Sequence, residues 1–232
     1  MGFDKEDLGF IIEKINNTKA IKIEGIFSHL AASEDKNEQN FTLNQIEKFQ
    51  NFSNKITENL NYQPLKHICN TSGILNYPEA HFDMVRSGIG LYGYGNAVEI
   101  DKKLKPIASL KTIISQIHQL KKGDSVSYNR KFKAEKAMKI ATLPLGYADG
   151  IHRSFADNNT KVFIKEKPAN IIGDICMDMI MIDISEIDCQ EGEEVLIFGD
   201  KQSAEKLAKT VHTISYELIT GISQRVKRVV LE

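Results

Sequence analysis

The hydrophobic pattern changes near residue 100, and this change constrains the fold more than any other feature of the sequence. Up to residue 95, apolar residues at helical spacing alternate with short apolar runs that are typical of strands. Helices are predicted at 5–16, 40–60 and 73–77, and strands at 21–28, 66–70, 83–86 and 90–92. Strands that alternate with helices imply parallel strands joined by helical crossovers.

Beyond residue 104 the sequence is a succession of short β-branched runs separated by turn residues. Strands are predicted at 108–119, 139–145, 161–164, 169–172, 179–184, 194–198 and 226–231, and helices at 204–211 and 216–221. This region is predicted to be a mostly antiparallel β-domain. The fold class is therefore α/β plus β, with one domain at residues 1–100, a second at 101–232, and a boundary between residues 96 and 105.

The charge balance and the apolar runs exclude several classes of protein. The 232 residues include 30 Lys and Arg against 31 Asp and Glu, which leaves no electrostatic basis for binding nucleic acid. No apolar run is long enough to span a membrane, and the first residues carry no export signal. Cys69, Cys176 and Cys189 have no metal-binding spacing and cannot all pair. We therefore predict no metal site, and reduced thiols in a cytoplasmic protein.

Polar residues and glycines follow the predicted strands of the first domain. They are His29, then Asn70-Thr71-Ser72-Gly73, then Arg86-Ser87-Gly88-Ile89-Gly90. In a parallel α/β architecture, ligands bind at the carboxyl ends of the strands. Each group also has a plainer interpretation: His29 as a structural histidine, Asn70 as a helix cap, and Arg86 in a surface ion pair with Asp83 or Glu79.

The stretch Ser87-Gly88-Ile89-Gly90 leaves backbone N–H groups free to face an anion. Thr71 and Ser72 offer hydroxyls at the start of a helix, which also suits a phosphate. No Walker or Rossmann signature is present. The pattern indicates a phosphate bound without a nucleotide loop.

A tyrosine stands at a strand end in the second domain, within Gly146-Tyr147-Ala148-Asp149-Gly150. The apolar run at 140–145 predicts a buried strand that leads directly into this glycine-bounded turn. Such a placement suits a residue that exchanges protons with a ligand. Taken alone, the pentapeptide favours a plainer interpretation, a buried tyrosine beside an ordinary turn.

Six short motifs are spread over nearly the whole chain: Gly25-Ile26-Phe27-Ser28-His29, Asn70-Thr71-Ser72-Gly73, Met84-Val85-Arg86-Ser87-Gly88-Ile89, Gly146-Tyr147-Ala148-Asp149-Gly150, Ile175-Cys176-Met177-Asp178 and Ser215-Tyr216-Glu217. Their order and approximate spacing resemble those of the alanine racemase family, which uses pyridoxal 5'-phosphate. The resemblance implies the C-terminal part of a (β/α)8 TIM-like barrel followed by a β-rich domain. It also implies interconversion of L-alanine and D-alanine, which supplies D-alanine for peptidoglycan.

The resemblance implies catalytic roles for three residues. Tyr147 would be the acid and base on one face of the substrate Cα, His29 would hydrogen-bond that tyrosine, and Arg86 would face the pyridine nitrogen of the cofactor. A phenol ordinarily keeps its proton at neutral pH, so it acts as a base only where positive charge and hydrogen bonds stabilise the phenolate. A chain from Tyr147 through His29 to Arg86 would supply both.

Further residues match binding positions of the family. His67 matches the histidine that supports Arg86, and Met177 matches the residue whose backbone N–H meets the substrate carboxylate. The phosphate-binding positions correspond to Thr71, Gly88, Ile89 and Tyr216. Thr71 stands where a serine is common, and its hydroxyl preserves the contact.

Racemisation needs a second acid/base group on the opposite face of Cα. In the family this group is the lysine that holds the cofactor, on a barrel strand upstream of every motif matched here, and no lysine of this sequence stands in a matching context. This chain is therefore expected to be the C-terminal part of the enzyme and inactive alone. The family also forms head-to-tail homodimers, in which Tyr147 and Met177 would serve the partner's barrel.

Two alternatives remain open. One is a racemase of the same fold with another amino-acid specificity, because side chains at the entrance of the site decide the substrate. The other is a non-catalytic protein that binds pyridoxal phosphate and has lost the lysine. The presence of Tyr147, His29 and Arg86 together argues against the second alternative.

Overall fold

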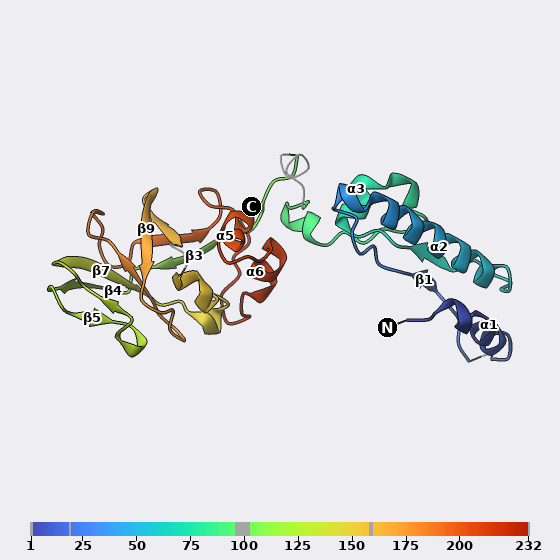
Figure 1. Ribbon diagram of the computed structural model, residues 1–232, viewed down its shortest axis with the longest axis horizontal. Helices are drawn as coiled ribbons and strands as arrows, with labels where there is room; N and C mark the ends of the chain where they lie inside the picture. The colour runs from blue at the N-terminus through green and yellow to red at the C-terminus, as the bar shows by residue number, and fades with distance from the viewer. Residues whose placement is uncertain (1, 19, 96–102, 158–159, 232) are drawn as a thin grey trace. The chain divides into compact units, whose positions relative to one another are not determined.

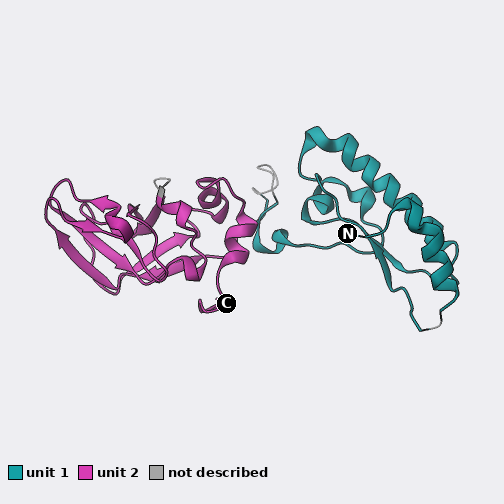
Figure 2. Ribbon diagram, turned by 60° about the horizontal axis from the view of Figure 1, so that its bottom comes forward, with its two compact units in different colours: residues 1–105 teal, residues 106–232 magenta. Residues whose placement is uncertain are grey.

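The computed structural model describes residues 2–18, 20–95, 103–157 and 160–231. The chain folds as two units, Met1–Lys105 and Pro106–Glu232, which Figure 2 shows in different colours. The predicted boundary between residues 96 and 105 falls largely on 96–102, which lie outside the described residues.

Unit 1 is built on two short parallel strands and the helices around them (Figure 1). Its elements are α1 (Leu8–Asn16), β1 (Gly25–Phe27), α2 (Gln39–Thr57), β2 (Leu65–His67) and α3 (Thr71–Asn76), with 3-10 turns at Lys5–Asp7, Lys36–Glu38, Pro78–Ala80 and Ile89–Tyr92. β1 and β2 pair in register from Gly25 opposite Leu65 to Phe27 opposite His67. Because the strands are parallel, their carboxyl ends lie side by side.

The long helix α2 turns its apolar stripe toward the strands. Ile46, Phe49 and Ile56 are buried as the helical spacing predicts. Ile46 and Phe49 pack in a core cluster with Leu30, Ile68, Cys69, Tyr77 and Ala80. Full burial of such side chains contributes roughly 1.5–3 kcal/mol each. This core anchors the chain segments that lead out of β1 and β2.

Two predicted strands of unit 1 are wrong. Residues 83–86 form no strand, although Asp83 N–H donates to Lys66 O in β2 and Arg86 N–H donates to Cys69 O just beyond it. Residues 90–92 belong to the 3-10 turn Ile89–Tyr92. Gly93, which ends this turn, has a φ of 87°, a left-handed conformation that glycine adopts without strain.

Unit 2 contains an antiparallel sheet of seven strands in the order β3-β11-β8-β9-β10-β7-β4. Its strands are β3 (Leu110–Ile113), β4 (Gln116–Leu120), β7 (Met138–Leu143), β8 (Lys161–Ile164), β9 (Lys167–Ile172), β10 (Ile180–Asp183) and β11 (Glu194–Phe198). A separate hairpin pairs β5 (Ser125–Val126) with β6 (Phe132–Lys133). Helices α5 (Ala204–Lys209) and α6 (Ser215–Gly221) contact each other, as Figure 1 shows. Short 3-10 turns lie at Tyr128–Arg130, Tyr147–Asp149 and Arg153–Asp157.

Two predictions for unit 2 need correction. The strand predicted at 108–119 is two strands, because the chain leaves β3 and re-enters the sheet as β4 on the opposite edge. The strand predicted at 226–231 does not form, and Val229, Val230 and Leu231 are exposed. Their apolar, β-branched character favours a strand, but a strand also needs a neighbour that completes its backbone hydrogen bonds.

Within the described residues, none of the helices combines the length and the apolar character needed to cross a membrane.

Candidate functional site

Arg86 joins the carboxyl ends of the two parallel strands. Its Nη1 donates to His67 Nδ1 at 2.6 Å, and its Nη2 donates to the carbonyl oxygen of Ser28 at 2.8 Å. Nη2 also lies 3.3 Å from Ile68 O and 3.4 Å from His29 Nδ1. The side chain thus faces the strand ends and does not pair with Asp83, whose carboxylate accepts the N–H of Lys66. The structure brings His29 and Arg86 together at the strand ends, and it places His67, a residue suggested by the resemblance, in contact with Arg86.

His67 is held as a neutral imidazole. Arginine has donors but no acceptor, so the Nδ1 atom that meets Arg86 is unprotonated and the ring proton is on Nε2. Burial, and then the positive charge of Arg86, lower the pKa of His67 below its usual 6.5. The ring of Phe27 stacks on the imidazole with centroids 5.3 Å apart. The pair therefore presents a charged arginine on a neutral, oriented histidine.

Acidification should destabilise unit 1 through His67. A histidine whose pKa is lowered by folding contributes stability that is present above the unfolded value of about 6.5 and is lost as the pH falls toward the folded value. We expect His67→Gln, which can still accept from Arg86 but cannot titrate, to lose less stability between pH 7.5 and pH 5.5. Urea unfolding at the two pH values measures this.

The exposed His118→Gln is the matched control and should leave the pH dependence unchanged. A pH dependence that is the same in His67→Gln and in the unsubstituted chain would contradict the assignment.

The glycine loop at 88–90 closes on the start of α3. The hydroxyl oxygen of Thr71 accepts the N–H groups of Gly88 at 3.0 Å and Gly90 at 3.2 Å. A Cβ on Gly90 would lie 2.9 Å from Thr71 Cγ2, so this approach requires glycine. Asn70 caps α3 by accepting the N–H of Gly73, as its plainer interpretation predicts. The N–H groups of Gly88 and Gly90 thus donate to Thr71 and are not free to face an anion, contrary to the prediction. The hydroxyl O–H of Thr71, at the start of α3, remains available as a donor to a phosphate.

Tyr147 is not a core residue. It follows β7 in a 3-10 turn, and its side chain is 41% exposed. The turn is fastened to the loop before β10, because Tyr147 N–H donates to Cys176 O and Ala148 N–H donates to Met177 O, each at 3.0 Å. Met177 is 49% exposed. Two predicted site residues of unit 2 therefore stand on neighbouring loops, with their side chains free to meet a ligand.

Glycines allow this close approach. A Cβ on Gly146 would lie 2.3 Å from the carbonyl oxygen of Cys176, and one on Gly150 would lie 2.3 Å from that of Gly221. Gly221 ends α6, the helix that carries the predicted phosphate-binding Tyr216. The predicted site residues thus divide between the two units. Unit 1 holds His29, His67, Thr71, Arg86, Gly88 and Ile89, and unit 2 holds Tyr147, Met177 and Tyr216.

The sequence did not predict an ionic cluster of Asp149, Asp178 and Arg225, which lies next to the Tyr147 turn. The carboxylate of Asp149 meets Arg225, which also pairs with Asp178. The hydrogen bond from Arg225 lowers the pKa of Asp149; burial opposes this shift, and the N–H of Gly146 adds to it. Asp149 and Asp178 lie inside the recognised motifs, whereas Arg225 lies in no motif. Only the opposite charges could have signalled the contact.

Family comparisons cover nearly the whole chain. The model for "Alanine racemase, N-terminal domain" matches residues 1–96, and that for "Alanine racemase, C-terminal domain" matches residues 107–230. The alanine racemase of Clostridium tetani is 43% identical over 234 residues, covering 97% of this chain and 60% of the relative. Alanine racemase 1 of Clostridium acetobutylicum is 43% identical over 229 residues, covering 95% and 59%.

Solved structures similar to this chain are also alanine racemases. Alanine racemase of Clostridium difficile 630 in complex with cycloserine has a TM-score of 0.85 at 36% identity, covering 96% of this chain and 60% of that one. Alanine racemase of Bacillus anthracis with bound L-Ala-P has a TM-score of 0.88 at 29% identity, covering 97% and 59%. The chain thus spans about 60% of the length of these relatives. The predicted fold class, the C-terminal part of a TIM-like barrel followed by a mostly antiparallel β-domain, is confirmed.

Proposed function

Because this chain belongs to the alanine racemase family, we propose that it is part of an enzyme that interconverts L-alanine and D-alanine with pyridoxal 5'-phosphate. The D-alanine would supply peptidoglycan synthesis. The arrangement of Arg86, His67 and His29 at the ends of two parallel strands carries the proposal, because a guanidinium supported by a neutral histidine beside a phosphate-like cradle suits this cofactor. The complete enzyme would comprise this chain joined to the upstream barrel segment of its relatives.

Unit 1 offers suitable groups for the cofactor. Nη1 and Nη2 of Arg86 are engaged, and among the described residues the Nε–H of Arg86 meets no acceptor, so this N–H would donate to the pyridine nitrogen. Arginine does not readily give up its proton, so the pyridine nitrogen would stay unprotonated. Thr71 accepts two N–H groups, which leaves its own O–H to donate to a phosphate oxygen. Ile89 and Tyr216 would add further phosphate contacts, and the N–H of Gly88 would join them by exchanging Thr71 for a phosphate oxygen.

Tyr147 would move the proton on one face of the substrate. When bound, the cofactor withdraws electron density from Cα and makes its hydrogen acidic. His29, which lies against the permanent charge of Arg86, would hydrogen-bond the phenol and stabilise its anionic form. The backbone N–H of Met177 would hold the substrate carboxylate. The lysine on the opposite face would come from the upstream segment.

The two units would have different roles in the enzyme. We propose that residues 1–100 form the cofactor-binding part of the barrel, and that the β-rich residues 101–232 bring Tyr147 and Met177 to the barrel of a partner subunit. The active enzyme would be a homodimer with shared active sites. The described cysteines are all free and buried, which fits a reducing cytoplasm.

The activity can be tested with two polypeptides. The 232-residue chain alone, with pyridoxal phosphate and L-alanine, should form no D-alanine, because the second base is not among its matched residues. The same chain preceded by the upstream segment of the Clostridium tetani relative should racemise alanine, as measured by coupled oxidation of the D-amino acid. Turnover by the chain alone would refute the two-base assignment.

The complete enzyme also separates the alternatives. Faster turnover of serine or a larger amino acid than of alanine would identify another specificity. Binding of pyridoxal phosphate without turnover of any amino acid would identify a non-catalytic protein.

A further inference from the structure

Asp149 ties the Tyr147 turn together from inside. The residue is only 6% exposed, and its Oδ2 accepts the N–H of Gly146 at 2.8 Å, across the turn. The same carboxylate accepts two bonds from Arg225, Nε to Oδ1 at 2.6 Å and Nη2 to Oδ2 at 3.1 Å. This paired geometry is specific to a guanidinium, because a lysine ammonium is a single point donor.

Arg225 reaches a second loop as well. Its Nη2 also donates to Asp178, the residue that follows Met177. One guanidinium therefore bridges the residue two positions after Tyr147 and the residue next to Met177. The backbone bonds from Tyr147 to Cys176 and from Ala148 to Met177 join the same two loops on their other side.

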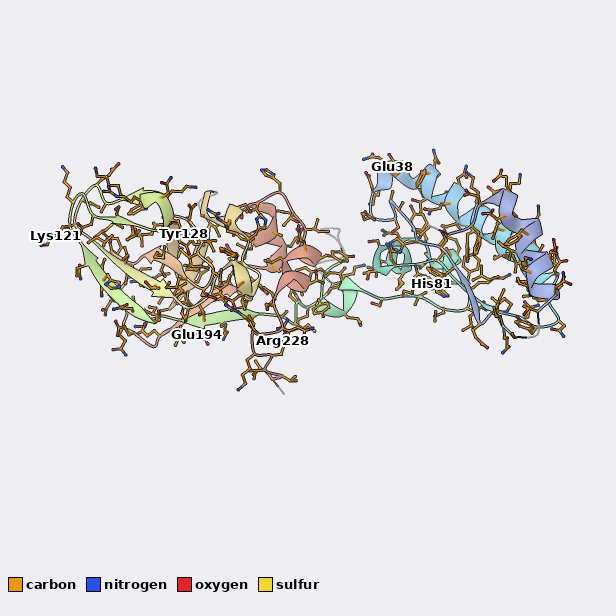
Figure 3. The ribbon with its side chains drawn as sticks, turned by 90° about the horizontal axis from the view of Figure 1, so that it is seen from below. Glu38, His81, Lys121, Tyr128, Glu194 and Arg228 are labelled. Carbon is orange, nitrogen blue, oxygen red and sulfur yellow. The ribbon has the colours of Figure 1, made fainter. Side chains whose placement is uncertain are left out.

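The segment that carries Arg225 is itself anchored. Ser223 N–H donates to the backbone oxygen of Asp149 at 3.0 Å. Arg228, labelled in Figure 3, donates to the carbonyl oxygens of Ile222 at 2.7 Å and Val226 at 2.8 Å, and also to that of Ser223. These bonds fold residues 222–228 into a hook directly after α6. The hook holds Arg225 between the two carboxylates.

We propose that Arg225 is a positioning residue for racemisation, which sets Tyr147 relative to Met177 by bridging Asp149 and Asp178. This inference rests on the proposed function. The side chains of Tyr147 and Met177 are about half exposed, so core packing does not hold them. Their placement therefore depends on the two loops that carry them. A proton transfer needs the donor and acceptor in hydrogen-bond reach, and small displacements slow it strongly.

The first experiment measures the loops without any cofactor. In the 232-residue chain, Arg225→Ala should raise hydrogen exchange at 146–150 and 175–178 by about tenfold or more, because the buried Asp149 loses its cation and both loops lose their bridge. Amides inside β7 and β10 should exchange as before. Asp178→Asn keeps the Asp149 pair and should loosen 175–178 alone. Lys227→Ala, which removes a nearby exposed cation, is the control and should change neither loop.

The second experiment measures proton transfer in the complete enzyme. Exchange of the substrate α-hydrogen with D2O reports each face of Cα separately. Arg225→Ala should slow exchange on the Tyr147 face by about 10- to 100-fold while exchange on the lysine face persists. Arg225→Lys should recover only part of the loss, and Lys227→Ala should behave like the unsubstituted enzyme. If Arg225 only supported the fold, Arg225→Ala would slow α-hydrogen exchange on both faces of Cα to the same extent.

The outcomes separate the two proposals. If the unsubstituted complete enzyme does not racemise any amino acid, the proposed function fails, and the hydrogen-exchange result still decides whether Arg225 holds the loops. The positioning role is overturned if the enzyme is active and Arg225→Ala does not raise amide hydrogen exchange in the two loops. It is also overturned if this variant slows α-hydrogen exchange equally on the two faces of Cα.

Discussion

Replacing Tyr147 by phenylalanine in the complete enzyme is expected to slow racemisation by about 100- to 10,000-fold, the range typical for loss of a general acid or base. The phenyl ring keeps the shape of the side chain but has no proton to transfer. The side chain is partly exposed on a turn held by backbone bonds, so the substitution should leave the fold intact. Initial rates in both directions measure the loss. Tyr128→Phe, at another exposed tyrosine of unit 2 (Figure 3), is the matched control.

Exchange of the α-hydrogen identifies the face on which Tyr147 works. The two enantiomers have equal free energy, so kcat/KM must remain equal in the two directions even when one base is lost. In D2O, Tyr147→Phe should abolish exchange from one enantiomer and preserve it from the other, because the second base still works. Residual exchange that is the same on both faces would remove Tyr147 from the mechanism.

Gly150→Ala is expected to destabilise unit 2 by about 2–5 kcal/mol, the sum of backbone strain and overpacking. Gly150 has a φ of 103°, a conformation that L-residues rarely adopt. A Cβ there would lie 2.3 Å from Gly221 O and 2.8 Å from Gly221 C, and backbone atoms cannot swing aside as a flexible side chain can. Urea unfolding of the 232-residue chain measures the change.

Gly192→Ala separates the two causes. Gly192 has a φ of 87°, but a Cβ there would meet nothing within 4 Å. This variant should therefore lose only the stability due to backbone strain, about 1–2 kcal/mol. Equal losses in the two variants would show that contact with Gly221 contributes nothing, and that α6 does not press on the Tyr147 turn as the structure indicates.

Local pattern was enough for most elements of the fold. The apolar stripe of α2 predicts a helix because burial of one face follows from helical spacing. The β-branched runs of β8 and β11 predict strands from composition and length, and β11 is buried on both faces. The wrong predictions were strands, because a strand forms only where a neighbouring backbone completes its hydrogen bonds. Residues 83–86, 90–92 and 226–231 have strand-like composition, yet their backbones find no regular ladder among the described residues.

The same distinction between local pattern and tertiary structure applies to the site. The sequence by itself determined the chemical groups and their family. His29, Arg86 and Thr71 stand in motifs that follow strands of a parallel architecture, where ligands bind, and Tyr147 stands in a motif at a strand end of the antiparallel domain. Only the tertiary structure decided how those groups are held. Arg86 orients on His67 across 19 residues, and Arg225 reaches Asp149 across 76 and Asp178 across 47. Such contacts leave no periodicity in the sequence, because a bond between distant residues is set by where the fold places them and not by their spacing along the chain.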